Sequence, residues 1–302
     1  MDPARAAVTR GTTSALRVIA LVIAVAACDA IPGAADQPPG TASPPVSLSP
    51  TERPVFWVEA PILGDPSPVL ARIPPTGAVV EGQTARLLRP PVTSTPRRVA
   101  IQVGHLRAEE APREFPNLRF QGGGSIDGIH EVDVNLDIAQ RVERLLTARG
   151  FVVDILPATV PPGHLADVFV ALHADADVFR EARGFKIAHG FYRGPHEGEL
   201  VRLLTEEYAA ATGFPWDPNV TDDMTDYYAF AWFRYEHALA PHTAAAILEM
   251  GFLSSEEDRA VLLGEPELVA EAIAGGISRF LAAVPRSELF AEDIIVPIVD
   301  PP

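Results

Sequence analysis

From Arg97 onward, short apolar runs alternate with amphipathic stretches, and this alternation constrains the fold more than any other feature of the chain. The runs have the length and composition of buried strands, and the stretches between them repeat apolar residues every three or four positions, as helices do. We therefore expect an α/β fold of three layers, with a central, mostly parallel β-sheet flanked by helices. The expected strands are 99–103, 151–156, 168–172, 185–188 and 244–249, and the expected helices are 132–149, 199–211, a short one from 254 and a last one from 266.

The first 28 residues have the features of a bacterial export signal. Three arginines within the first 17 residues precede the uncharged run Val18–Ala27. This run is too short to cross a bilayer as a helix, which takes about 20 residues. A positive start, a short apolar core and small residues at its end are typical of a secretory signal peptide. The sequence Val25–Cys28 resembles the lipobox of bacterial lipoproteins, which implies that Cys28 becomes the lipid-linked first residue of the mature protein.

Cys28 is the only cysteine, so the chain can form no internal disulfide. A buried structural cysteine, or an ordinary signal peptide cut nearby, is the alternative to the lipid anchor. The segment Asp29–Pro54 is rich in proline, alanine, serine and glycine, and it reads as a flexible tether. We expect an extracytoplasmic protein that is lipid-anchored to a bacterial cell membrane.

The charge balance argues against a nucleic-acid partner. The formal net charge is −16, with 24 Lys and Arg residues against 40 Asp and Glu residues. A nucleic-acid-binding protein needs a basic face that neutralises phosphates. Lys186 is the only lysine, so arginine supplies nearly all of the positive charge.

Histidine and glutamate residues follow or end several of the expected strands. His105 comes directly after the first strand, His173 follows the run 168–172, and Glu249 ends the run 244–249. Glu131 starts the first helix. If the strands are parallel, their carboxyl ends bring these residues to one edge of the sheet. Two imidazoles and one carboxylate suit a catalytic zinc, and a further carboxylate suits the general base. From spacing alone, histidines that simply lie at the edge of the sheet remain the alternative.

Four segments follow one another along the chain: VAIQVGH (99–105), HEVDVNLDIA (130–139), ADVFVALHADA (166–176) and AILEMGFLS (246–254). In this order they resemble successive blocks of the zinc N-acetylmuramoyl-L-alanine amidases. The resemblance covers roughly residues 98–283 and implies the zinc amidase fold of phosphorylase/hydrolase type. It also implies that His105, Glu131 and His173 bind Zn²⁺ and that Glu249 is the catalytic acid/base. The substrate would be peptidoglycan, cut at the amide between the lactyl group and L-alanine.

The segment between His105 and Glu131 departs from the family pattern. The family commonly has a short glycine-rich turn right after the first histidine, whereas here the glycines come only at 122–124. Residues 106–130 therefore form either a loop beside the site that affects substrate fit or a tolerated surface loop. Asp175 stands where the family usually has asparagine. Asp175, His130 and Arg234 are possible substrate-binding residues or residues that support the metal ligands.

An aromatic-rich segment lies between residues 214 and 235. Such a cluster can stack on sugar rings, but burial in the core is the interpretation that we favour.

We divide the chain into five parts. These are a lipoprotein signal peptide (1–27), a tether (28–54), a short β-type or irregular segment (55–97) with apolar runs at 55–58 and 78–80, the catalytic domain (98–284) and a C-terminal tail (285–302).

Two other functions remain open from the sequence. One is a non-catalytic relative that binds peptidoglycan or regulates its turnover, and the other is a zinc hydrolase of a different amide on the same scaffold. The presence of all four key residues argues against the first, and the segment 106–130 leaves the second open. An activator protein is possible, but the sequence does not identify one.

Overall fold

The structure is a computed structural model that describes residues 78–81, 84–93, 95–191 and 194–297. The predicted signal peptide, Cys28, the tether and the apolar run at 55–58 lie outside these residues. Among the helices that are described, none is both long and apolar enough to cross a membrane.

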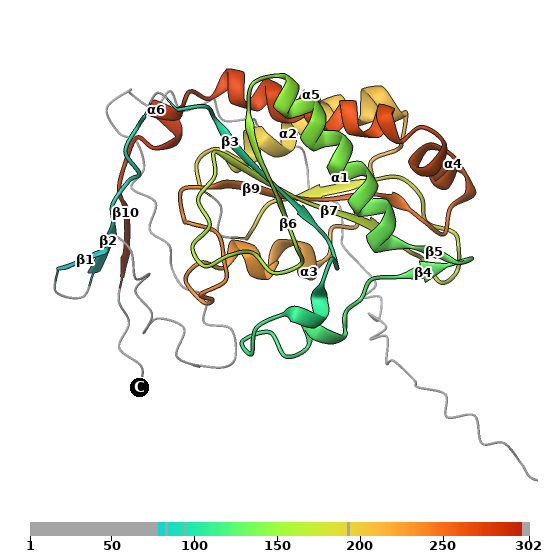
Figure 1. Ribbon diagram of the computed structural model, residues 1–302, viewed down its shortest axis with the longest axis horizontal. Helices are drawn as coiled ribbons and strands as arrows, with labels where there is room; N and C mark the ends of the chain where they lie inside the picture. The colour runs from blue at the N-terminus through green and yellow to red at the C-terminus, as the bar shows by residue number, and fades with distance from the viewer. Residues whose placement is uncertain (1–77, 82–83, 94, 192–193, 298–302) are drawn as a thin grey trace, which may run out of the picture. The chain divides into compact units, whose positions relative to one another are not determined.

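A five-stranded sheet forms the centre of the domain (Figure 1). Its strands are β3 (Arg98–Val103), β6 (Val152–Leu156), β7 (Val168–Asp175), β8 (Lys186–Ala188) and β9 (Ala244–Phe252). They lie in the order β6–β3–β7–β9–β8, and the first four run parallel. Within this sheet only β8 is antiparallel to its neighbour. The predicted mostly parallel sheet is therefore confirmed, and each predicted strand is present.

Four helices cover one face of the sheet, on the upper side in Figure 1. They are α1 (Glu131–Ala148), α2 (Glu197–Thr212), α4 (Glu256–Gly264) and α5 (Pro266–Ala283). Helix α1 buries Val134, Ile138 and Val142 at four-residue spacing, which is the periodicity that predicted it. Helix α4 begins where the Ser255 side chain accepts a hydrogen bond from the Asp258 backbone N–H. The helices predicted from these signals are all observed.

The opposite face is covered by short elements and loops rather than by long helices. The main ones are α3 (Asp222–Thr225) and the 3-10 helix η3 (Tyr228–Phe230). Phe230 packs in the same core cluster as Phe169, and their rings stand nearly perpendicular with centroids 6.4 Å apart. Phe214 and Phe230 are therefore core, as we favoured, and Tyr227 and Tyr228 pack against it. Trp216, at 41% exposure, is an exception.

Smaller elements lie outside the central sheet. A three-stranded antiparallel sheet joins β1 (Ala78–Glu81) and β2 (Thr84–Leu87) to β10 (Ile294–Pro297), so parts of the chain far apart in sequence pair with each other. The sequence indicated β1 but gave no signal for β10. Residues 106–130 hold two 3-10 turns and the hairpin formed by β4 and β5. Their bounds are η1 Ala108–Glu110, η2 Leu118–Phe120, β4 Ser125–Ile126 and β5 Ile129–His130, and α6 spans Arg286–Leu289.

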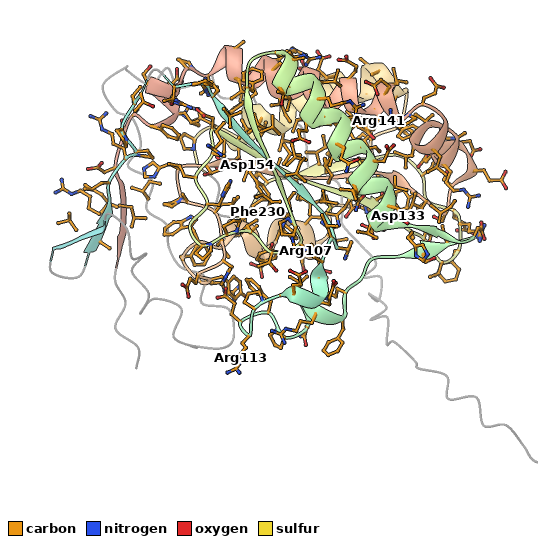
Figure 2. The ribbon with its side chains drawn as sticks, in the orientation of Figure 1. Arg107, Arg113, Asp133, Arg141, Asp154 and Phe230 are labelled. Atoms are coloured by element: carbon orange, nitrogen blue, oxygen red, sulfur yellow. The ribbon has the colours of Figure 1, made fainter. Side chains whose placement is uncertain are left out.

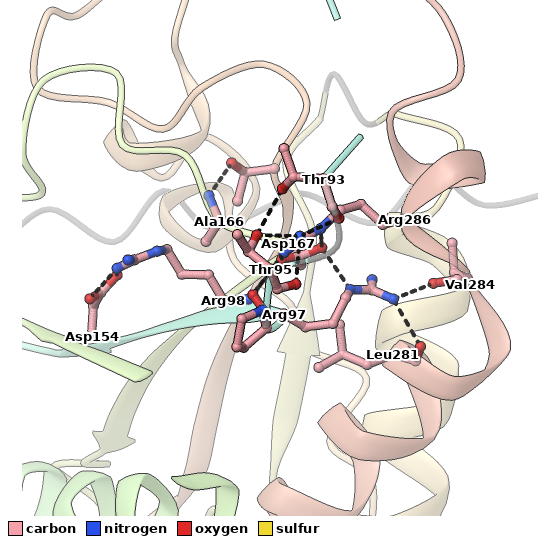
Figure 3. A network of polar contacts seen from close by, with 12 residues as sticks. Thr93, Thr95, Arg97, Arg98, Asp154, Ala166, Asp167, Leu281, Val284 and Arg286 are labelled. Atoms are coloured by element: carbon pink, nitrogen blue, oxygen red, sulfur yellow. Dashed lines mark hydrogen bonds and ion pairs between the residues drawn. The ribbon is translucent and has the colours of Figure 1, made fainter. Parts of the chain in front are cut away.

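A buried carboxylate ties down the amino-terminal edge of the sheet (Figure 3). Asp167, which precedes β7, accepts hydrogen bonds from Arg97 Nε at 2.6 Å and from the Arg98 backbone N–H at 2.7 Å. Arg286 also donates to it, at 2.8 and 2.5 Å. Burial alone would raise the pKa of Asp167, but the hydrogen bonds from Arg286 and Arg98 hold it below its ordinary value. Arg97 also binds two carbonyls at the end of α5, so this edge is held together by charge.

Candidate metal centre and catalytic site

The register of the sheet places four residues in one row at its carboxyl edge: Gly104, His173, Glu249 and Lys186. His173 on β7 is paired with Glu249 on β9, and Glu249 is paired with Lys186 on β8. Gly104 follows β3 and donates its N–H to the Leu172 carbonyl at 2.9 Å. Because neighbouring strands are in register and side chains alternate, the row faces the same side of the sheet as η3. The prediction that parallel strands bring His173 and Glu249 to one edge of the sheet is confirmed.

Three side chains converge beside this row. The Oε1 atom of Glu131 lies 3.2 Å from His105 Nε2 and 3.2 Å from His173 Nδ1. The two imidazole rings stand edge to face with centroids 4.9 Å apart. One nitrogen or oxygen from each residue lies within 4.8 Å of the others, which is close enough for all three to hold one metal ion.

The polar atoms of this cluster fit a divalent cation. His173 Nε2 is buried and has no hydrogen-bond partner among the described residues, which calls for a ligand, ion or water. His105 Nδ1 lies 2.8 Å from the Gln121 carbonyl oxygen. If Nδ1 carries the proton it donates to that carbonyl, so that Nε2 is free to bind a metal. Two imidazoles and one carboxylate are a donor set that zinc accepts.

Electrostatic contacts in the cluster favour an ionised glutamate. Burial alone would raise the pKa of Glu131, but hydrogen bonds and charge from His105 and His173 outweigh it and hold this pKa far below its usual range. Burial also opposes the charged form of His105, but its contacts with Glu131 raise the His105 pKa overall. Glu131 is the first residue of α1, where the helix dipole also favours a negative charge. A carboxylate held ionised is ready to bind a cation.

Two glycines make room for the cluster. A Cβ on Gly104 would lie 2.6 Å from both Nδ1 and Nε2 of His173, so this ring occupies the space above the glycine. Gly123 has a φ of +83°, and a Cβ there would lie 3.1 Å from His105 Cγ and 3.3 Å from Glu131 Oε2. Both positions therefore need glycine, the second also for its backbone conformation.

Glu249 lies next to His173 with one oxygen unpaired. Its Oε2 atom is buried and has no hydrogen-bond partner among the described residues, although the side chain is partly exposed. Burial raises the pKa of Glu249 well above its ordinary value, and the charges of Asp175 and Glu131 raise it further, whereas Lys186 lowers it. A carboxyl group with a raised pKa can both accept and donate a proton near neutral pH.

Lys186 is a buried, charged neighbour of the site that sequence reasoning did not place there. Its side chain is 6% exposed, and Nζ donates a hydrogen bond to Asp175 Oδ2 at 2.5 Å. A second carboxylate, Asp217, lies 3.9 Å away, and Nζ is 5.0 Å from the centroid of the Phe252 ring. The one available signal was that a chain rich in arginine keeps a single lysine in a strand near the predicted site.

The other candidate residues lie outside the three-residue cluster. His130 is exposed and is the N-cap residue of α1, directly before Glu131. Arg234 donates to both oxygens of Asp226 at 3.2 Å. In the segment 106–130, Arg107 and Arg113 are exposed (Figure 2), whereas the stretch from Gln121 to Gly124 returns to the metal ligands.

Comparison with known proteins assigns the family. The model of the N-acetylmuramoyl-L-alanine amidase family matches residues 99–279, which is more than half of the chain. The chain therefore belongs to the N-acetylmuramoyl-L-alanine amidases. It is an enzyme of this class, a hydrolase that acts on cell-wall peptidoglycan outside the cytoplasm. No curated protein matches the chain.

Several solved amidase structures are similar at low sequence identity. The catalytic domain of CwlV from Bacillus (Paenibacillus) polymyxa var. colistinus is 21% identical, covers 62% of this chain and 98% of its own, and has a TM-score of 0.43. The amidase Ami1 from Mycobacterium smegmatis is 18% identical over 63% of this chain and 98% of its own, with a TM-score of 0.48. CwlD from Clostridioides difficile, solved in complex with the GerS lipoprotein, is 18% identical over 62% and 99%, with a TM-score of 0.45.

Proposed function

We propose that this amidase is a zinc enzyme in which His105, Glu131 and His173 hold the metal and Glu249 is the catalytic acid/base. One observation carries the proposal: three ligand atoms lie within 4.8 Å of one another, beside a carboxyl group whose buried oxygen has no partner among the described residues. When bound, zinc supplies a Lewis acid that lowers the pKa of water towards about 7.

The protein residues have distinct tasks in this proposal. Glu249 takes a proton from the attacking water on Oε2 and later gives it to the leaving amine, a contribution of typically 100- to 10,000-fold. Glu131 stays ionised between the two imidazoles. The bond cut is the amide between the lactyl group of N-acetylmuramic acid and L-alanine, which is the bond that the family resemblance implies.

We further propose that Asp175 contacts the substrate. It lies two residues beyond His173, its side chain is 30% exposed, and Lys186 holds one of its oxygens. An acceptor at this position would bind N–H groups of the stem peptide. For Arg234, the ion pair with Asp226 competes with any bond to a stem-peptide carboxylate. His130, which directly precedes Glu131, is the candidate for an outer donor to the metal site.

Peptidoglycan release tests the proposal. The protein starting after Cys28 is incubated with purified peptidoglycan and zinc, and the new amino termini are identified. We expect free L-alanine amines on the released peptides, which disappear with EDTA and in Glu249→Gln but persist in the exposed control Glu288→Gln. Tight sacculus binding without release would support a non-catalytic binding protein, and new termini at other bonds would support a hydrolase of another amide.

We also propose that Cys28 anchors the enzyme to the membrane through lipid. The support is the lipobox-like sequence Val25–Cys28 after a short apolar run. Two or three acyl chains would anchor the protein stably, since each buried methylene contributes about 0.8 kcal/mol. Labelled palmitate should enter the wild-type protein but not Cys28→Ser in a bacterial host. Equal labelling, or equal release of both proteins from membranes, would refute the anchor.

A further inference from the structure

The segment 106–130 makes direct contact with two of the three candidate metal ligands. The Gln121 carbonyl oxygen lies 2.8 Å from His105 Nδ1, and the Gly124 N–H donates to Glu131 Oε2 at 3.0 Å. Gly123 lies between these contacts and packs against the His105 ring. A segment that sequence analysis could take for a surface loop therefore supplies the outer contacts of His105 and Glu131.

The third candidate ligand, His173, contacts a tyrosine that is distant from it in sequence. The Tyr227 ring stands edge to face against the His173 ring, with centroids 5.9 Å apart. The Tyr227 hydroxyl donates to Oε1 of Gln102 at 2.8 Å. Gln102 is fully buried on β3, so it is a fixed partner. The His173 ring thus contacts Tyr227 and occupies the space above Gly104.

The same glutamine connects Tyr227 back to the segment 106–130. Gln102 Nε2 donates to the Tyr228 hydroxyl at 2.7 Å and to the Ala158 carbonyl at 3.0 Å. The Tyr228 ring packs on Phe115, with centroids 4.5 Å apart. Phe115, Tyr228, Gln102, Tyr227 and His173 therefore form one continuous series of contacts.

Both ends of the segment are fixed to the rest of the domain. Near its start, Glu114 accepts hydrogen bonds from the backbone N–H groups of Glu236 and His237 at 3.1 and 3.0 Å. Near its end, Asp127 pairs with Arg180 at 2.8 Å and with Arg259 at 2.7 Å. Because the segment is held at both ends, it can fix the positions of the residues that it contacts.

We propose that Phe115 and Tyr227 are positioning residues for the metal centre, so that segment 106–130 sets the metal affinity and not only the shape of the substrate cleft. This inference rests on the metal site of the proposed function. Groups that orient metal ligands typically change metal affinity 10- to 100-fold when they are removed. We expect a loss of that size for Phe115→Ala and for Tyr227→Leu.

The matched control is Phe120. It belongs to the same segment but is 89% exposed, whereas Phe115 is 8% exposed. Zinc affinity is measured by competition with a chelator on the protein starting after Cys28, and Co²⁺ absorption spectra report the ligand geometry. Phe115→Ala and Tyr227→Leu should bind zinc at least ten-fold more weakly and alter the Co²⁺ spectrum, and Phe120→Ala should match the wild type.

Further variants separate support of the ligands from general stability. Phe115→Leu and Tyr227→Phe keep most of the packing, and they should show smaller losses of affinity in the same direction. Thermal unfolding in EDTA measures the stability of the metal-free fold. Variants that melt at lower temperature but bind zinc like the wild type would overturn the inference. Failure of the wild type itself to bind zinc would instead overturn the proposed function.

Discussion

Substitution of Gly104 by alanine tests the geometry of the metal centre most directly. The new Cβ would lie 2.6 Å from both ring nitrogens of His173. Ordinary contacts between non-bonded heavy atoms are about 3.5 Å or longer. The ring must therefore move by close to 1 Å, and the neighbouring Tyr227 ring, 5.9 Å from it between centroids, limits where it can go.

The size of this displacement gives the expected effect. Metal–ligand distances tolerate a deviation of about 0.2 Å, so a shift of about 1 Å removes His173 from productive geometry. A misplacement of about 1 Å costs roughly 100-fold in rate, which is about 2.7 kcal/mol of barrier. Overpacking of the site should in addition lower the stability of the metal-free protein by about 1–3 kcal/mol.

Three measurements check the Gly104→Ala prediction. Peptidoglycan hydrolysis gives kcat/KM, chelator competition gives zinc affinity, and urea unfolding in EDTA gives stability. Gly264→Ala is the control, because a Cβ at that glycine has no heavy atom within 4 Å. We expect at least about 100-fold lower kcat/KM and weaker zinc binding for Gly104→Ala alone. Wild-type zinc affinity and activity in this variant would refute the reasoning.

Three further predictions follow from the same site. Gly123→Ala should weaken zinc binding in chelator competition, because Gly123 has a φ of +83° and a Cβ there would press on His105 and Glu131. Gly122→Ala is the control, because a Cβ at Gly122 has open space, and equal zinc affinities of the two variants would contradict the prediction. Lys186→Met should destabilise the protein by about 2 kcal/mol in urea unfolding, less than the 3–5 typical of a fully buried pair because Asp175 is partly exposed. Adding Asp175→Asn should recover most of that loss, and additive losses would show that the two side chains are not coupled. The raised pKa of Glu249 means that the folded protein binds this proton more tightly than the unfolded chain, so metal-free stability should fall as pH rises above about 4.5. In urea unfolding from pH 4.5 to 8, Glu249→Gln should lessen this fall, and parallel curves for the two proteins would exclude the raised pKa.

Local sequence patterns were sufficient to predict the catalytic edge of the sheet. Strand-like runs before His105 and His173 and through Glu249 gave the strands, and their parallel register followed from the alternation with helices. The family resemblance then supplied the roles. These features are readable because each depends on residues that are close in sequence or on one simple rule of topology.

Other features depend on partners that are distant in the chain. Strand β10 forms because Ile294–Pro297 pairs with β2 in an antiparallel ladder, and β2 lies more than 200 residues earlier in the chain. The antiparallel direction of β8 and the burial of Lys186 against Asp175 depend on the path of the loop between β7 and β8. The return of Gln121–Gly124 to the ligands likewise depends on where both ends of the segment are fixed. No periodicity encodes such contacts.

The small sheet of β1, β2 and β10 has a mechanical consequence. A pull on the chain from the N-terminal side of β1 first loads this sheet, where the Arg89 backbone N–H also binds Asp293 at 2.9 Å. The next bonds in line are those of Arg286 to Thr95 and Asp167, on the edge of the central sheet opposite the metal ligands. Tension would therefore break the contacts of the small sheet and of Arg286 before it reaches the row of His173 and Glu249. The metal centre would keep its geometry while the chain is pulled.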